Sequence, residues 1–204
     1  MLEPRPWLDA AARVGSTVTL YHGTNTQAWE IACHNGQLAA RTDWAGFVGA
    51  VEAEFGLRPK AVWLHPVSSF TRTARQGDGH VYCTADKAIA ASYAAQGSEA
   101  IADTLRAVYS VLHPHTSPFV ASAKPALDRF VADWMERHHM APLVLTLAVP
   151  LAELPIPASS LIKDPAEWWA AANHFGPRPA VVFDGSIPLN WVTDPTPPAP
   201  SLGI

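Results

Sequence analysis

The chain has 204 residues, of which 49% are hydrophobic and 16% charged, and its formal net charge is −4. This length and composition predict one globular domain. The acidic balance argues against a nucleic-acid coat or a polybasic membrane binder, and the sequence has neither a long apolar run nor a start typical of a secretory signal. Two cysteines, Cys33 and Cys83, cannot form a disulfide framework or a four-cysteine zinc site. We therefore expect a reduced, cytoplasmic protein without a metal or a membrane partner.

The N-terminal part of the chain contains two strand patterns and two helix patterns. β-Branched and aromatic residues predict the strands. Asn25 or Thr26 before a helical stretch, with Gly36 behind it, predicts a capped helix. In chain order, the expected elements are a strand over 17–21, a helix over 26–34, a short helix over 48–55 and a short strand over 61–64.

Two strands and three helices are expected in the middle of the chain. Asp86 is a suitable cap for the first helix, and Gly97 is expected to end that helix soon after Ala95. Apolar residues at helical spacing predict the other two helices. In order, these elements are a strand over 80–84, helices over 86–95, 101–112 and 125–139, and a strand over 143–149.

Proline and glycine divide the last part of the chain. Pro165 predicts the first turn of a helix to Asn173, and a turn at Asp184-Gly185 separates a strand over 180–183 from an extended piece over 187–192. The proline-rich end is expected to stay outside the sheet. We therefore assign residues 1–194 to the domain and 195–204 to a tail. Strands and helices that alternate irregularly favour a mixed α+β domain over a doubly wound parallel sheet.

Two short motifs and the helix predicted after the second contain three of the four tyrosines. The first, Tyr21-His22-Gly23-Thr24, stands at the end of a predicted strand, where glycine lets a ligand approach the backbone beside an imidazole. The second, Val81-Tyr82-Cys83-Thr84, is followed by Tyr93, eleven residues after Tyr82 and on the next helix. Taken singly, the motifs fit a strand-end turn and a pair of packed core aromatics equally well.

Together, the two motifs resemble the ADP-ribosyltransferase superfamily. The branch resembled has a histidine-tyrosine-variable triad and includes the poly(ADP-ribose) polymerases and the diphtheria-type toxins. Its members have a strand ending in histidine-glycine-serine or -threonine, then a tyrosine strand, then a helix with a second tyrosine eleven residues on. The resemblance covers roughly residues 17–95. It implies a split antiparallel β-sheet core flanked by helices, with NAD as co-substrate.

The resemblance also implies how NAD would bind. The nicotinamide amide would contact the Gly23 backbone, and its ring would stack between Tyr82 and Tyr93. His22 would hydrogen-bond a hydroxyl of the adenosine ribose, with Thr24 as a second polar contact. The glycosidic bond to nicotinamide would break through an oxocarbenium-like transition state, which a nearby carboxylate would stabilise.

The third catalytic position departs from the family pattern. The family usually has a glutamate that opens the late strand, where this chain has Pro179 or Ala180. Asp184, at the far end of that strand, joins His22 and Tyr82 in the expected catalytic set, although it equally fits a plain turn. Without the glutamate, elongation into poly(ADP-ribose) is not expected. The other candidates for this position are Glu167, Asn173 and His174.

The segment between Gly56 and Gln76 has basic side chains and no acid. The family places this segment along the cleft for the donor NAD. Arg72 and Arg75 are therefore expected to contact the pyrophosphate of NAD or a phosphate-bearing acceptor, which suits a planar guanidinium. A solvated basic face explains the same charges equally well. The basic residues of the segment are Arg58, Lys60, His65, Arg72 and Arg75.

These features predict an NAD-dependent mono-ADP-ribosyltransferase. The acceptor stays open among proteins, nucleic acids and small molecules, and the biological role among a toxin, an effector and an antibiotic- or phage-related modifying enzyme. A non-catalytic module that binds NAD or ADP-ribose is one alternative. An RNA 2′-phosphotransferase-like enzyme is another, which Tyr82 opposes because that activity would have a histidine there. A hydrolase using His22 and Asp184 lacks a nucleophile elbow.

Overall fold

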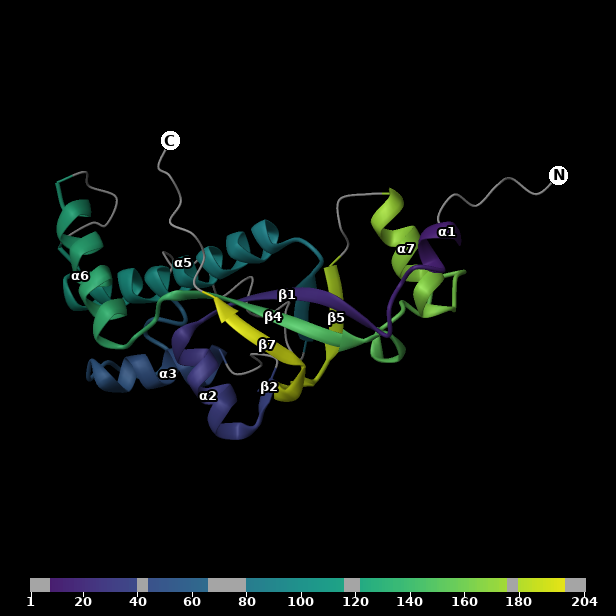
Figure 1. Ribbon diagram of the computed structural model, residues 1–204. Coiled ribbons are helices and arrows are strands. Elements are labelled where there is room, and N and C mark those ends of the chain that lie inside the picture. The colour runs from purple at the N-terminus through teal and green to yellow at the C-terminus, as the bar shows by residue number, and fades with distance from the viewer. Residues whose placement is uncertain (1–7, 40–43, 66–79, 116–121, 176–179, 197–204) are drawn as a thin grey trace.

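The computed structural model describes residues 8–39, 44–65, 80–115, 122–175 and 180–196. These residues form an α+β fold around a five-stranded sheet with the strand order β5-β3-β1-β4-β7 (Figure 1). All neighbouring strands are antiparallel. The strands of this sheet are β1 (Thr17–Asn25), β3 (His80–Thr84), β4 (Pro142–Pro150), β5 (Ala180–Asp184) and β7 (Val192–Thr196). The α+β class with an antiparallel sheet is therefore confirmed.

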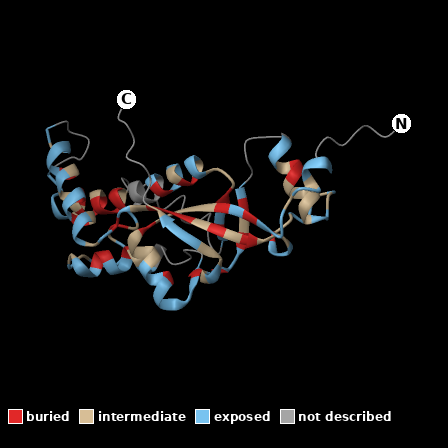
Figure 2. Ribbon diagram, in the orientation of Figure 1, coloured by how far each residue is buried: buried red, intermediate tan, exposed pale blue. Residues whose placement is uncertain are grey.

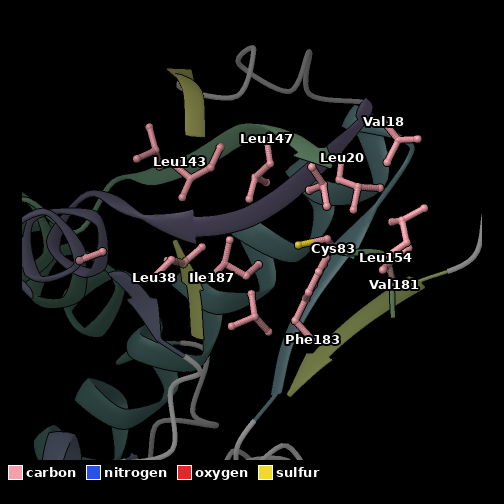
Figure 3. Close-up of a cluster of buried hydrophobic side chains, with 14 residues drawn as sticks. Val18, Leu20, Leu38, Cys83, Leu143, Leu147, Leu154, Val181, Phe183 and Ile187 are labelled. Carbon is pink, nitrogen blue, oxygen red and sulfur yellow. The ribbon is translucent and has the colours of Figure 1, made fainter. Parts of the chain in front are cut away.

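One face of the sheet is covered by an apolar core. Side chains alternate across a strand, and Leu20, Leu147 and Phe183 all point to this face, as Figure 3 shows. A second, two-stranded sheet of β2 (Gln37–Ala39) and β6 (Ser186–Pro188) adds Leu38 and Ile187 to the same core. Cys83 is also buried here, and burial raises the pKa of its thiol to about 12. This thiol is therefore a packing group, because a nucleophilic cysteine needs its thiolate form.

The other face of the sheet is covered by the first half of helix α5 (Lys87–Leu112). Ala90 and Ala94 of this helix are fully buried with Val144 of β4. The second half of α5 packs with α3 (Trp44–Glu54) and α6 (Lys124–Arg137) around Ile101 and Leu105. Figure 2 shows the buried positions on α5 and in the sheet. No helix in the described ranges has the length and apolar character needed to cross a membrane.

Several helix ends form as the sequence predicts. The Asn25 side chain accepts a hydrogen bond from the Ala28 N–H at 2.9 Å and caps α2 (Thr26–Asn35). Gly36 follows with φ 74°, the left-handed backbone that favours glycine after a helix. Asp86 caps α5 by accepting from Ala88 and Ile89. The remaining elements are α1 (Leu8–Ala11), α7 (Pro165–Phe175) and the 3-10 turns η1 (Leu151–Glu153) and η2 (Leu189–Trp191).

The prediction that Gly97 ends a helix is wrong. The two helices expected over 86–95 and 101–112 are one continuous helix, α5. Ala90, Ala94, Ile101 and Leu105 are all buried at helical spacing. This burial outweighs the cost of about 1 kcal/mol for a glycine in a helix interior.

The short strand expected over 61–64 is also wrong, because these residues form a turn around Glu52. Glu52, on α3, is 3% exposed. Its carboxylate accepts main-chain N–H groups from Lys60 and Val62, both at 2.7 Å, and from Trp63 at 3.2 Å. These bonds satisfy donors that a strand would have used, and one of them supports the unusual positive φ of 63° at Lys60.

Replacing Glu52 with glutamine should therefore destabilise the fold. The amide would present its NH₂ group either to the Lys60 N–H or to the Val62 and Trp63 N–H groups, so at least one donor would lose its acceptor. We expect the free energy of unfolding to fall by about 2 kcal/mol, measured by urea denaturation. Glu54→Gln is the matched control, since Glu54 is half exposed and pairs with His138 at 3.6 Å, so its effect should stay below about 1 kcal/mol. Equal stability of the two variants would contradict this role of Glu52.

The prediction that the tail from Pro195 stays outside the sheet is wrong for its first two residues. Pro195 lies in β7 opposite Leu145, and Thr196 lies opposite Val144. β7 is an edge strand, where the missing N–H of proline can face away from the ladder. The sheet therefore extends through Thr196, beyond the boundary that the sequence predicted.

Candidate active site

Strands β1 and β3 diverge at the residues of the first motif. β1 pairs with β4 along all nine of its residues, whereas its ladder with β3 has a single pair, Tyr21 opposite Thr84. β3 continues instead with β5, to which all five of its residues are paired. Within the described residues, His22, Gly23 and Thr24 thus lie on an edge of β1 that has no ladder partner on the β3 side. Both motifs border this divergence.

The side chain of His22 bridges the two diverging strands. Its Nδ1 lies 2.8 Å from the main-chain carbonyl oxygen of Tyr82. A carbonyl oxygen only accepts, so Nδ1 carries the proton and donates. In the neutral ring Nε2 is then the acceptor nitrogen, suited to a hydroxyl donor such as that of a sugar. The two residues that the sequence motifs single out are thus brought together by a hydrogen bond.

Tyr82 and Tyr93 lie on the face of the sheet that carries α5. Tyr82 alternates with Val81 and Cys83, which point into the core on the opposite face. Tyr93 is on α5, and its main chain lies next to Gly23. Their side chains are 43% and 47% exposed, a high value for large aromatic residues. No contact between the two rings is found in the described part of the structure, so their stacking on a shared ligand stays a prediction.

Gly23 has a packing role that the sequence did not reveal. A Cβ atom at this position would lie 2.1 Å from the carbonyl oxygen of Ala90 and 2.5 Å from the main-chain nitrogen of Ala94. The glycine therefore lets α5 lie directly on β1. The space that a side chain would fill is occupied by the helix, and only the main-chain groups of Gly23 remain to contact a ligand.

Asp184 lies on the same face as Tyr82 and is held by a histidine. It ends β5 directly opposite His80, and its Oδ1 is 2.7 Å from His80 Nδ1. The His80 ring meets the Tyr82 ring edge-on, with 6.3 Å between the centroids. Sequence reasoning missed His80. The signal was available, because His80 stands two residues before Tyr82 on one strand and so shares its face.

The other candidates for the third position lie elsewhere. Glu167, Asn173 and His174 are on α7, which packs against α1 and η1 at one end of the molecule (Figure 1). The Asn173 side chain donates to the Trp169 carbonyl at 2.7 Å. Ala180, one of the two residues expected where the family has its glutamate, opens β5 opposite Thr84. Of the four candidate residues, only Asp184 is brought beside Tyr82.

The predicted phosphate contacts are only partly visible. Arg72, Arg75 and Pro179 lie outside the described residues. Arg58 and Lys60 belong to the turn around Glu52. The basic segment between Gly56 and Gln76 is therefore bonded, through the Lys60 main chain, to an acid that precedes it in the sequence. Across the described ranges, no three histidine, cysteine or acidic side chains are grouped in a way that could hold a metal ion.

The fold and the site thus define an α+β protein in which histidine and tyrosine side chains border a divergence of two sheet strands. Compared with protein-family models, curated proteins and solved structures, the chain gives no significant match. The function is therefore argued from the residues and their geometry.

Proposed function

We propose that the chain is an NAD-dependent mono-ADP-ribosyltransferase that binds NAD where β1 and β3 diverge. The observation that carries this proposal is the hydrogen bond from His22 Nδ1 to the Tyr82 carbonyl. This bond joins His22 of the first motif to Tyr82 of the second, and it orients the acceptor nitrogen of the imidazole. The exposure of the Tyr82 and Tyr93 rings on the face next to Gly23 supports the same site.

In this proposal, each group at the divergence has one binding role. His22 Nε2 accepts a hydrogen bond from a ribose hydroxyl of NAD. The nicotinamide ring stacks between Tyr82 and Tyr93, because aromatic rings associate through offset or edge contacts. Its amide pairs with the main chain of Gly23, whose edge of β1 is free of a ladder partner on the β3 side within the described residues. Binding thus combines a directional contact to the adenosine ribose at His22 and another to the nicotinamide amide at Gly23 with an apolar contact at the nicotinamide ring.

The reaction would break the bond between nicotinamide and the ribose carbon. The bond electrons pass to the pyridinium nitrogen, and positive charge develops on the sugar. A carboxylate on the same face favours this charge, and Asp184 is the described carboxylate beside Tyr82. Since Pro179 or Ala180 is expected where elongating members of the family have glutamate, the proposed transfer is of single ADP-ribose units.

Nicotinamide release from NAD tests the proposal. The wild-type protein should release nicotinamide, and His22→Ala should bind NAD about tenfold more weakly, because one hydrogen bond of about 1.4 kcal/mol is lost. The measurement pairs a release assay with calorimetric NAD titration. His34→Ala is the matched control, since His34 is an exposed histidine at the end of α2, and it should bind and turn over NAD as the wild type does.

A non-catalytic NAD-binding module is the second candidate, and the missing glutamate at the start of β5, where this chain has Pro179 and Ala180, favours it. The two functions give different results in the same experiment. A module would be stabilised against heat by NAD, would lose that stabilisation in His22→Ala, and would release no nicotinamide. If the wild type released no nicotinamide and NAD did not stabilise it against heat, both functions would be contradicted.

A further inference from the structure

We propose that His80 is the general base that deprotonates the ADP-ribose acceptor, and that Asp184 is the residue that positions His80. This inference rests on the proposed transferase function and adds a second role for Asp184 to its electrostatic effect on the sugar cation. It also names the class of acceptor. The two residues are paired with each other beside Tyr82.

The sheet fixes the main chain on both sides of the pair. His80 and Asp184 stand directly opposite each other at one end of the β3–β5 ladder, which comprises five consecutive residue pairs. Directly opposed side chains in an antiparallel pair have Cβ atoms about 5 Å apart, which matches the 2.7 Å contact between His80 Nδ1 and Asp184 Oδ1. The geometry of the pair is thus set by strand pairing and does not depend on a loop.

The carboxylate determines which nitrogen of His80 carries the proton. An ionised carboxylate only accepts hydrogen bonds, so His80 Nδ1 is the donor and Nε2 has the lone pair. Across the described residues, Asp184 is the one residue that hydrogen-bonds the His80 ring. The His80 side chain is 41% exposed, so a second molecule can reach it. A carboxylate that orients an imidazole and stabilises its protonated form is the arrangement that a histidine base needs.

The pair also lies at the proposed reaction site. His80 and Tyr82 share one face of β3, and their rings meet edge-on with centroids 6.3 Å apart. In the proposed complex, Tyr82 stacks on nicotinamide, which is bonded to the reacting carbon of the ribose. A nucleophile held by His80 would therefore approach beside the ring that leaves.

The proposed step balances in atoms and charge. The bond between the nicotinamide nitrogen and the ribose carbon breaks, and its electron pair makes nicotinamide neutral. The acceptor atom forms a new bond to the same carbon, and its proton passes to His80 Nε2. The positive charge of the pyridinium thus ends on the imidazolium of His80, next to the Asp184 carboxylate.

This chemistry selects the acceptor. A general base is needed when the nucleophile is neutral and carries a proton, as a hydroxyl or an N–H group does. A carboxylate acceptor is already ionised and has no proton for a base to remove. We therefore assign the acceptor to molecules that present a neutral hydroxyl or nitrogen nucleophile.

The test compares water with azide as the acceptor. Water needs a base, whereas azide is an anionic nucleophile with no proton to lose. His80→Ala should release nicotinamide in water at least about 100-fold more slowly than the wild type, with NAD affinity unchanged within twofold. Azide should restore release in this variant and give ADP-ribosyl azide, identified by mass spectrometry. Asp184→Asn should be slowed in water about tenfold or more and be rescued in the same way, and His34→Ala should match the wild type throughout.

Three results would overturn the assignment, and they separate it from the function on which it rests. If the wild type releases nicotinamide and His80→Ala does so at the same rate in water, His80 is not the base. If His80→Ala is equally slow with azide, or has lost NAD affinity, its role is structural. If the wild type releases no nicotinamide with either acceptor, the proposed transferase function is wrong, and so is the assignment of His80 as its general base.

Discussion

Gly23→Ala should lower the free energy of unfolding by about 3 kcal/mol or more. The added methyl group would meet the Ala90 carbonyl oxygen at 2.1 Å and the Ala94 nitrogen at 2.5 Å. Both atoms belong to the main chain of α5, so no side-chain rotation can relieve the clash, and the helix must move away from β1. Overpacking of a buried contact commonly costs 1–3 kcal/mol and costs more where the backbone must shift. Urea denaturation followed by circular dichroism measures the change.

Gly49→Ala is the matched control for this prediction. Gly49 lies in α3, and a Cβ at that position has no neighbour within 4 Å. The same substitution should therefore raise stability there by up to about 1 kcal/mol, because alanine is the better helix former. If both variants unfolded at the wild-type urea concentration, α5 would not lie on β1 as closely as the structure shows.

The packing role of Gly23 also affects how activity data should be interpreted. A loss of nicotinamide release in Gly23→Ala follows from displacement of α5 alone, since Tyr93 is on that helix next to Gly23. Such a loss would not show that the Gly23 main chain contacts NAD. His22→Ala is the more informative variant, because the His22 side chain is partly exposed and reaches across the divergence to the main chain of residue 82, whereas Gly23 is held under α5.

Local signals in the sequence were sufficient for several elements. The bounds of α2 followed from Asn25 and Gly36, the start of α5 from Asp86, and the start of α7 from Pro165. Each of these residues acts on the backbone within a few positions of itself. Elements defined by such residues can be predicted without knowledge of the rest of the fold.

Errors arose where tertiary contacts outweighed a local signal. Gly97 is a poor helix residue, but buried side chains on both sides keep α5 continuous. The strand propensity of residues 61–64 is overridden by the carboxylate of Glu52, and Pro195 is accepted because β7 is an edge strand. The continuous helix, the turn at 61–64 and the proline in β7 cannot be predicted from neighbouring residues in the sequence, because each depends on contacts made in the folded chain.

The candidate site also has residues that the sequence predicts and a residue pair that only the fold reveals. His22, Tyr82 and Tyr93 were predicted from two motifs that resemble the ADP-ribosyltransferase pattern, and the structure places them at or beside one divergence of strands. The partnership of His80 with Asp184 depends on the register between β3 and β5. These strands are far apart in sequence, so their register is set by tertiary pairing and could not be predicted from either strand alone.

Tyr82→Ala should reduce kcat/KM for nicotinamide release about 100-fold while leaving the fold intact. Removal of a stacked ring loses about 2 kcal/mol of apolar burial and about 1 kcal/mol of aromatic contact, and each 1.36 kcal/mol corresponds to a factor of ten in rate. The thermal midpoint should change little, since Tyr82 is 43% exposed and packs little against the rest of the fold.

This variant isolates the ring from the other contacts of the site. His22 bonds the main-chain carbonyl of residue 82, which alanine retains, so the imidazole keeps its orientation. Tyr82→Phe is the matched control, because it preserves the ring and removes only the hydroxyl, and it should stay within about threefold of the wild type. Equal losses in the alanine and phenylalanine variants would mean that the hydroxyl acts in the reaction. An unchanged rate in both would mean that nicotinamide does not stack on Tyr82, and that the divergence of β1 and β3 binds its ligand through the His22 side alone.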